Sequence, residues 1–350
     1  MSKSHRRPPT PDRRAVVLGG SALLGAAALP PAVAGAAEPG FGSAAELLAA
    51  MRRFLAGLEP DKQKAASFAW NGPEWRGWNY FGFPSVIKPG LRLEQMDAAQ
   101  NTAAWDLLAT LLSPQGLAKA KNVMLLQDVL ASQGDGAGQR SSERFSFAVF
   151  GTPADTGAWG VRLEGHHLHH SVSVRDGQIV SVTPSSFSSN PNRIASGPHA
   201  GLNTLKDEEA LARRLIGDLA PRLQGRARVS GTALNNILSY AGRERANAKK
   251  VGLPVAELAP AQRDLLWQLI EVYTVEHLSP ALANVQRSRV RSGDQAAIHF
   301  AWYGPNTPER AFGYRVIGDG FVIEMGSVDP AALHLHTVYI DLPSVLGRTA

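Results

Sequence analysis

The feature of the sequence that most constrains the fold is a run of short β-strands between residues 144 and 183. Residues 145–150 alternate apolar and small side chains, and residues 159–163 follow after a Gly-Thr-Pro turn. Residues 166–174 alternate again and lead through an Arg-Asp-Gly-Gln turn into residues 179–182. Connections this short join antiparallel strands, because a parallel pair needs a long crossover. The segment therefore predicts an antiparallel sheet.

Helices precede this run, and both helices and strands follow it. The predicted helices, which have apolar residues at helical spacing, span residues 43–58, 91–112, 115–133, 205–219 and 261–290, with a break at Pro280. Further predicted strands span residues 296–303, 311–317, 321–325 and 333–340. We expect an α+β fold with an antiparallel β-sheet core and surrounding α-helices. Although 350 residues could form two small domains, we expect residues 37–350 to form one.

Three other stretches bear on the fold. The aromatic residues within 67–83 form either a platform for a flat ligand or part of the core. Residues 68–73 and 300–305 match at five of six positions, which marks either two similar strands of a pseudo-repeated sheet or a coincidence. Residues 184–204 are rich in Ser, Asn, Pro and Gly and are expected to form a long loop.

The N-terminus has the layout of a signal peptide of the twin-arginine type. Arg13 and Arg14 precede an apolar run at residues 15–29, and small-residue cleavage patterns follow by residue 36. We therefore expect residues 1–36 to direct export to the periplasm or the medium, with no stable membrane insertion once the leader is removed. An uncleaved membrane anchor is the alternative.

Charge and cysteine content exclude several classes of protein. Residues 1–36 carry five basic residues and one acidic residue, a net of +4, so that only +2 of the formal +6 remains after the leader. No concentrated basic patch is left, and we expect no nucleic-acid partner. The sequence has no cysteine, which excludes disulfides, thiolate metal sites and cysteine nucleophiles.

Two histidine clusters are the candidates for chemistry. Four of the ten histidines lie within residues 166–170, and His334 and His336 form a second pair. Neutral imidazole is a ligand for Zn, Cu, Fe or Ni. The candidate ligands of a divalent metal such as Zn are His166, His167, His334 and His336, and the candidate catalytic groups are His166, His167, Glu324 and Arg162. Glu324 would be a ligand or general base, and Arg162 would hold an anionic substrate. The alternative is that these are surface or hydrogen-bonded sheet residues.

The expected strand geometry limits how the first cluster can be used. His166 and His167 are adjacent, so on a regular strand their side chains face opposite sides of the sheet. At most one of them then faces a shared pocket, unless a bulge after Gly165 turns both inward.

Several motifs resemble a bacterial family catalogued as domain of unknown function 3500. They include the run Trp-Gly-Val-Arg-Leu-Glu-Gly-His-His-Leu at 159–168, the Asn-Pro pair at 190–191, and the His-Leu-His of 334–336. The resemblance spans residues 45–342 and implies no assigned activity. It implies shared features at His166, His167, Asn190, His334 and His336, whereas His169 and His170 fall outside the family pattern.

The sequence leaves three functions open. We favour an exported, metal-dependent enzyme of hydrolytic type with a histidine-lined site and a small-molecule ligand. The alternatives are a periplasmic ligand- or metal-binding protein without turnover, and a purely structural exported protein. The favoured interpretation requires the two histidine clusters to lie together in the fold.

Overall fold

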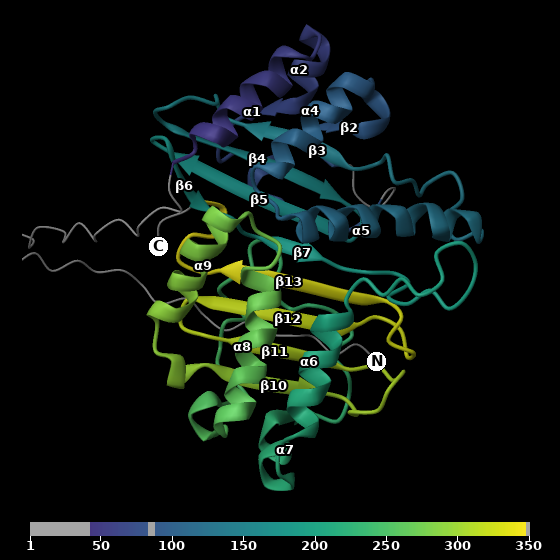
Figure 1. Cartoon of the computed structure of the whole chain (residues 1–350), viewed down its shortest axis with the longest axis vertical. Helices are drawn as coiled ribbons and strands as arrows, with labels where there is room; N and C mark the ends of the chain where they lie inside the picture. The colour runs from purple at the N-terminus through teal and green to yellow at the C-terminus, as the bar shows by residue number, and fades with distance from the viewer. Residues whose placement is uncertain (1–42, 83–87, 348–350) are drawn as a thin grey trace, which may run out of the picture. The chain divides into compact units, whose positions relative to one another are not determined.

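The computed structural model describes residues 43–82 and 88–347. The predicted signal peptide at residues 1–36 lies outside these residues. Within them the chain forms α-helices and a mostly antiparallel sheet of thirteen strands, which confirms the α+β prediction (Figure 1). No helix of the described residues is long and apolar enough to cross a membrane.

The helices begin at recognisable sequence signals. Proline occupies the first turn of six of the nine described α-helices, where its missing N–H costs nothing. Asp97 caps its helix by accepting a hydrogen bond from the Gln100 N–H, and the Gln100 side-chain oxygen accepts one from the Asp97 N–H. The α-helices are α1 (Ala45–Ala56), α2 (Pro60–Ala66), α3 (Pro73–Arg76), α4 (Ala98–Ala109), α5 (Pro114–Ser132), α6 (Lys206–Gly217), α7 (Pro221–Ala227), α8 (Pro260–Thr274) and α9 (Pro280–Ser292).

The long strands follow the predicted alternation, and four short strands that were not predicted add to them, at residues 91–92, 185–187, 228–230 and 253–254. The start of the predicted helix 91–112 is a short strand, and the predicted loop 184–204 contains another. The strands are β1 (Ser67–Phe68), β2 (Leu91–Arg92), β3 (Ser146–Phe150), β4 (Ala158–Gly165), β5 (Leu168–Arg175), β6 (Gln178–Ser181), β7 (Ser185–Phe187), β8 (Arg228–Ser230), β9 (Leu253–Pro254), β10 (His299–Tyr303), β11 (Gly313–Ile317), β12 (Phe321–Ser327) and β13 (Leu335–Asp341).

The sheet is built from two equivalent halves. Its strand order is β1-β3-β4-β5-β7-β13-β12-β11-β10-β8, with β2 also on β3 and β9 also on β10. The thirteenth strand, β6, pairs with β5 and has no counterpart in the second half. In each half a short strand lies parallel to the first long strand, β1 on β3 and β8 on β10, and a second short strand lies antiparallel to it. The following strands then form an antiparallel meander. The registers make Arg162 equivalent to Arg315.

A pseudo-twofold axis relates the halves. The same registers make Ser185 of β7 equivalent to Tyr339 of β13, and these two residues pair with each other across the antiparallel join. In the helical layer an antiparallel bridge joins Leu112 to Leu278. Each of these residues lies two positions before the proline that begins a helix, Pro114 of α5 and Pro280 of α9. The sheet is therefore a pseudo-repeat. The matching hexapeptides do not mark it, because β1 is equivalent to β8 and not to β10, so the interpretation of their match as a sign of the repeat is wrong.

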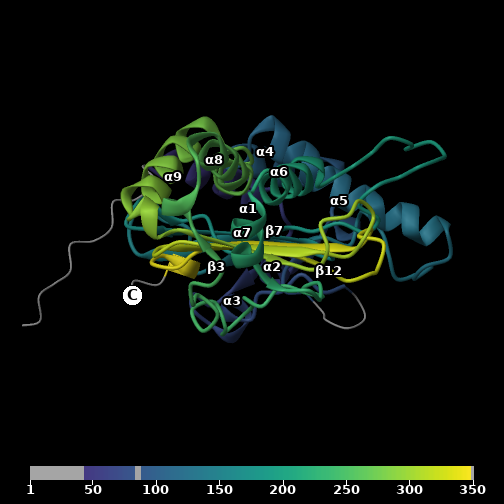
Figure 2. The ribbon, with the colours of Figure 1, turned by 90° about the horizontal axis from the view of Figure 1, so that it is seen from below.

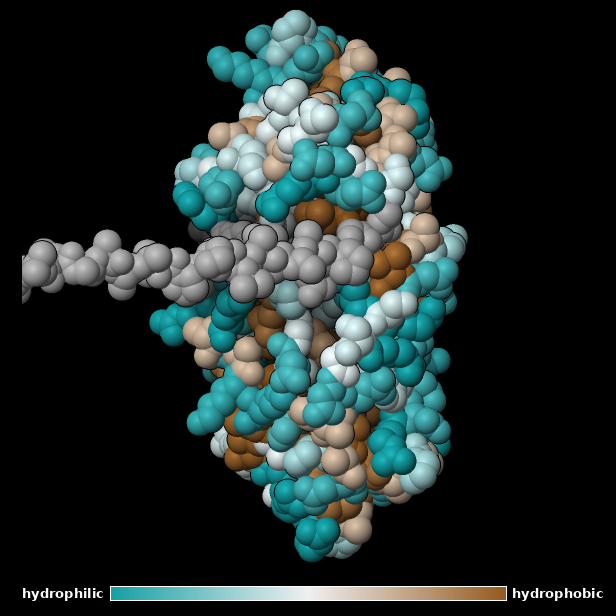
Figure 3. Space-filling view, turned by 90° about the vertical axis from the view of Figure 1, so that its left-hand side faces the viewer, coloured by the Kyte–Doolittle hydropathy of each residue, from teal (hydrophilic) through white to brown (hydrophobic). Residues whose placement is uncertain are grey.

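Helices cover one face of the sheet and loops the other. Figure 2 shows α4, α5, α6, α8 and α9 on one side and α3 on the opposite side. Each half has its own hydrophobic core beneath its helices. A third core lies under the loops and contains Trp75, Trp78 and Tyr80, each at most 2% exposed. These three rings fill core, as the second interpretation predicts, whereas Phe81 is 45% exposed and Phe83 lies outside the described residues. The face in Figure 3 is mostly hydrophilic with small apolar patches.

Candidate metal centre

His166 and His167 form the two-residue turn between β4 and β5. Gly165 pairs with Leu168 across the turn, and His167 adopts a left-handed backbone with φ of 67°. The His167 N–H donates to the Tyr80 carbonyl at 2.9 Å, and its carbonyl accepts from the Ser188 N–H at 2.8 Å. The expectation of two strand residues on opposite faces was therefore wrong. Because both residues lie in the turn, their side chains do not alternate between the two faces of the sheet, and the ring centroids lie 3.8 Å apart.

The second histidine pair comes from the other half of the chain. His336 lies on β13 opposite Gly326 of β12, and His334 immediately precedes that strand. A carboxylate oxygen of Asp329 accepts a hydrogen bond from the His334 N–H at 2.6 Å. A backbone bridge between Ser189 and Leu335 joins this segment to the loop after β7. The join between the halves therefore brings the two clusters together.

Three imidazole nitrogens converge at this join. The Nε2 atoms of His167 and His334 are 2.9 Å apart, those of His334 and His336 are 3.0 Å apart, and those of His167 and His336 are 3.2 Å apart. With metal–nitrogen bonds of about 2.0–2.1 Å, such separations correspond to angles of about 90–105° at a shared ion. These three residues could hold a metal ion.

The tautomer of His336 is fixed by Asn236. The Asn236 Oδ1 accepts from the Ile237 N–H and the Tyr80 hydroxyl, both at 2.8 Å, and lies 2.9 Å from His336 Nδ1. Because a backbone N–H can only donate, this Asn236 atom is the amide oxygen, and His336 Nδ1 must carry the proton. The lone pair of His336 then lies on Nε2, as a metal ligand requires.

Burial keeps the three rings neutral. His167 and His336 are 1% and 6% exposed, and His334 is half-buried. Desolvation lowers the pKa of His336 to about 3 and that of His167 well below its usual range, and it also lowers the pKa of His334. Neutral imidazole is the form that binds a metal.

His166 lies beside the histidine triad, which consists of His167, His334 and His336. Its ring packs on His167, but its Nδ1 lies 2.8 Å from the Gln127 Oε1 and 2.6 Å from Arg140 Nη1. Burial, helped by the nearby Arg140 charge, lowers its pKa to about 3. The candidate ligand His166 therefore contacts the triad but is not part of it, and its Nδ1 is bonded to the Gln127 and Arg140 side chains.

Glu324 and Arg162 do not join the cluster. The Glu324 carboxylate accepts from the N–H groups of Leu238 and Ser239, from the Ser239 hydroxyl, and from Arg315 Nε. It thereby fixes the loop that carries Asn236.

Arg162 has a similar anchoring role in the first half. It donates to the carbonyls of Glu74 and Trp75 in α3, which follows β1, and to Ser171 and Glu164. Both residues therefore anchor segments that cover the sheet. Asn190 is half-buried next to Ser189, whose backbone bonds Leu335, and its side chain is not part of the triad.

Two residues at the site had no sequence signal. Asn236 lies in a stretch of mixed character, and Tyr80 is one of many aromatic residues in its segment. Their role depends on loops that meet over the sheet, which local patterns do not reveal.

The fold and site define a duplicated α+β protein with a buried three-histidine centre where its halves join. The chain belongs to the family described as protein of unknown function (DUF3500), whose model matches residues 42–343. The resemblance seen in the sequence is thereby confirmed. No curated protein and no solved structure matches the chain significantly.

Proposed function

We propose that this protein is an exported metal-dependent enzyme of hydrolytic type, with its ion held by His167, His334 and His336. The observation that carries the proposal is the convergence of their Nε2 atoms to within 2.9–3.2 Å. Three protein ligands leave one position of a tetrahedral ion open, which is the arrangement of catalytic zinc sites, whereas structural sites are closed by four.

The chemistry of the ligands favours hydrolysis. Three neutral imidazoles leave the full charge of a divalent cation uncompensated, and such an ion lowers the pKa of a bound water toward neutrality. The described residues place no carboxylate within the group of metal-binding side chains. Export rests on the twin-arginine pattern of the leader, and this route would allow the ion to be acquired before translocation.

The alternative is a periplasmic protein that binds a metal or a ligand without turnover. The near-complete burial of His167 and His336 favours it, because a deeply buried ion exchanges ligands slowly. The number of protein ligands separates the two functions: an ion with an exchangeable water supports the enzyme, and one closed by a fourth protein ligand supports binding alone.

Elemental analysis of protein purified without a His tag tests the metal site. The wild type is expected to hold one ion per chain after incubation with Zn²⁺ and gel filtration, and a His334→Ala/His336→Ala variant none. His199 is exposed and outside the triad, so His199→Ala is the matched control and should retain the ion. An equal metal content in the double variant would overturn the proposal.

A further inference from the structure

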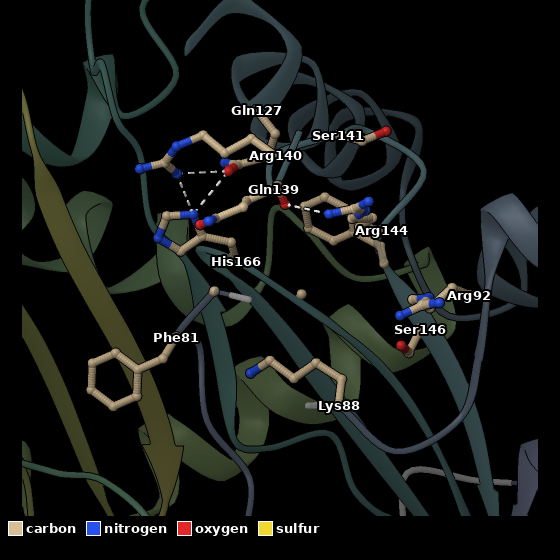
Figure 4. Close-up of a pocket in the computed structure, with 13 residues that line it drawn as sticks. Phe81, Lys88, Arg92, Gln127, Gln139, Arg140, Ser141, Arg144, Ser146 and His166 are labelled. Carbon is tan, nitrogen blue, oxygen red and sulfur yellow. Dashed lines mark hydrogen bonds between the residues drawn. The ribbon is translucent and has the colours of Figure 1, made fainter. Parts of the chain in front are cut away.

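A small pocket adjoins the triad through His166. It lies between the loop after α5 and the ends of β3 and β4 (Figure 4). Its volume is about 40 Å³. A single water needs about 10–15 Å³ of such space, so the pocket can hold a group of several heavy atoms. Its polar wall consists chiefly of Lys88, Arg92, Arg140, Arg144, Ser146 and His166.

The wall is cationic. None of the residues that line the pocket is acidic, whereas four are Lys or Arg. Lys88 and Arg162 share one buried carboxylate, Glu164, which leaves an excess positive charge in a nearly dry environment. The Asp135 carboxylate that pairs with Arg140 is 53% exposed, and solvent screens that pair. Arg92 and Arg144 likewise share one carboxylate, Glu94. The cations at the pocket therefore outnumber their carboxylate partners, and an anion entering it would meet a favourable potential.

Besides Arg92 Nε, which forms an ion pair with Glu94 at 2.7 Å, two polar atoms at the pocket have no hydrogen-bond partner among the described residues. Ser146 is fully buried, yet its hydroxyl is unpaired, and the Nε of Arg140 is buried and unpaired. A buried polar atom without a partner is costly, so natural structures nearly always supply one. Both atoms are donors, and an oxyanion is rich in acceptors.

The equivalent pocket in the second half is an internal comparison. By the sheet registers Gly165 and His166 correspond to Gly318 and Asp319, and these latter residues line a pocket of about 260 Å³. That wall contains three acidic residues and one Arg: Asp294, Asp319, Asp341 and Arg289. The cationic wall is therefore no consequence of the repeated fold. It occurs in the half that carries the histidine turn.

The cationic pocket lies next to the proposed ion. Arg140 Nη1 is 2.6 Å from His166 Nδ1, and the His166 ring packs on that of His167 with centroids 3.8 Å apart. The His166 ring therefore separates a group bound by Arg140 from the proposed metal ligand His167.

We propose that this pocket is an oxyanion subsite, which seats a carboxylate or phosphoryl group of the substrate beside the metal centre. The inference rests on the proposed function and specifies its substrate class as an anionic small molecule. Arg140 supplies charge-assisted hydrogen bonds, which are about twice as strong as neutral ones. Ser146 would be a further donor.

Calorimetric titration with inorganic phosphate, and separately with acetate, tests the subsite and distinguishes the two chemistries. Metal-free wild-type protein, prepared with a chelator, is used beside the metal-loaded form, because an anion could otherwise bind the ion itself. We expect one of the two anions to bind the metal-free protein. Arg140→Gln should weaken that binding about tenfold or more, since it removes a charge-assisted hydrogen bond.

The matched control is Arg289→Gln, which removes one cation from the equivalent pocket and should leave the affinity unchanged. Thermal unfolding of both variants checks that each is folded, and Arg140→Lys, which restores the charge, should recover part of the affinity. Metal content should stay at one ion per chain in Arg140→Gln, so that failure of this proposal is distinct from failure of the metal site. The subsite is overturned if neither anion binds the metal-free protein, or if Arg140→Gln binds as the wild type does.

Discussion

The Nε2 atoms of His167 and His334 lie 2.9 Å apart, although the residues are 167 positions apart in the chain. One comes from a hairpin turn in the first half of a duplicated fold, and the other from the segment that enters β13 in the second half. The antiparallel join of β7 and β13 brings them together. The candidate centre therefore exists only when both halves are folded and joined.

Asn236 should control the metal affinity without contacting the ion. Its oxygen accepts the Nδ1–H of His336 and so keeps the lone pair on Nε2. Loss of such an outer hydrogen bond typically costs about 10–100-fold in metal affinity. We expect Asn236→Ala to weaken Zn²⁺ binding by this factor in a competition titration with a chelator. Its exposed neighbour provides the control, and Asn235→Ala should bind as the wild type does.

Glu324 should be needed for stability and not for metal content. It is fully buried and bonded to Arg315, so Glu324→Gln leaves a buried cation uncompensated. Breaking one partner of a buried pair costs about 3–5 kcal/mol. Urea unfolding should show a loss of that order, with one ion still bound per folded chain. Glu46→Gln, at an exposed helix position, should change little. Unchanged stability together with lost activity would instead make Glu324 a catalytic base.

Two histidines outside the triad should make the fold sensitive to acid. Burial lowers the pKa of His169 to about 4 and that of His170 to about 3, against an ordinary value near 6.5. Between these values the unfolded chain binds more protons than the folded one, so the free energy of unfolding falls as pH decreases. The contribution is complete above pH 6.5 and declines from there toward pH 4.

Urea midpoints of metal-free protein at several pH values measure this decline. His170→Gln should flatten the dependence between pH 6.5 and 4, whereas His199→Gln, at an exposed position, should leave it unchanged. A stability that does not vary over this range would contradict the buried, neutral state of His170.

Local patterns in the sequence predicted the long helices and strands but neither the short strands nor the geometry of the site. The alternation in residues 145–182 and 296–340 identified the strands, because each element buries one or both faces. The duplication stayed hidden, since equivalent positions hold different residues: Arg162 faces Ser171 in one half, and Arg315 faces Glu324 in the other.

The histidines were found by clustering, but their geometry depends on tertiary structure. The two-residue turn at His166 and His167 requires a left-handed backbone at a histidine, which the alternating pattern concealed. The position of Glu324, ten residues before a histidine pair, predicts a ligand or base. Its partners are backbone groups of a loop whose course no periodicity specifies.

X-ray absorption spectroscopy of the zinc-loaded protein measures the ligands of the proposed ion. We expect three imidazole nitrogens at about 2.0–2.1 Å and one further oxygen from water. His336→Ala should lose one of the imidazole contributions or the ion itself. A spectrum of the wild type without three imidazole ligands, or one unchanged in His336→Ala, would contradict a metal centre at His167, His334 and His336.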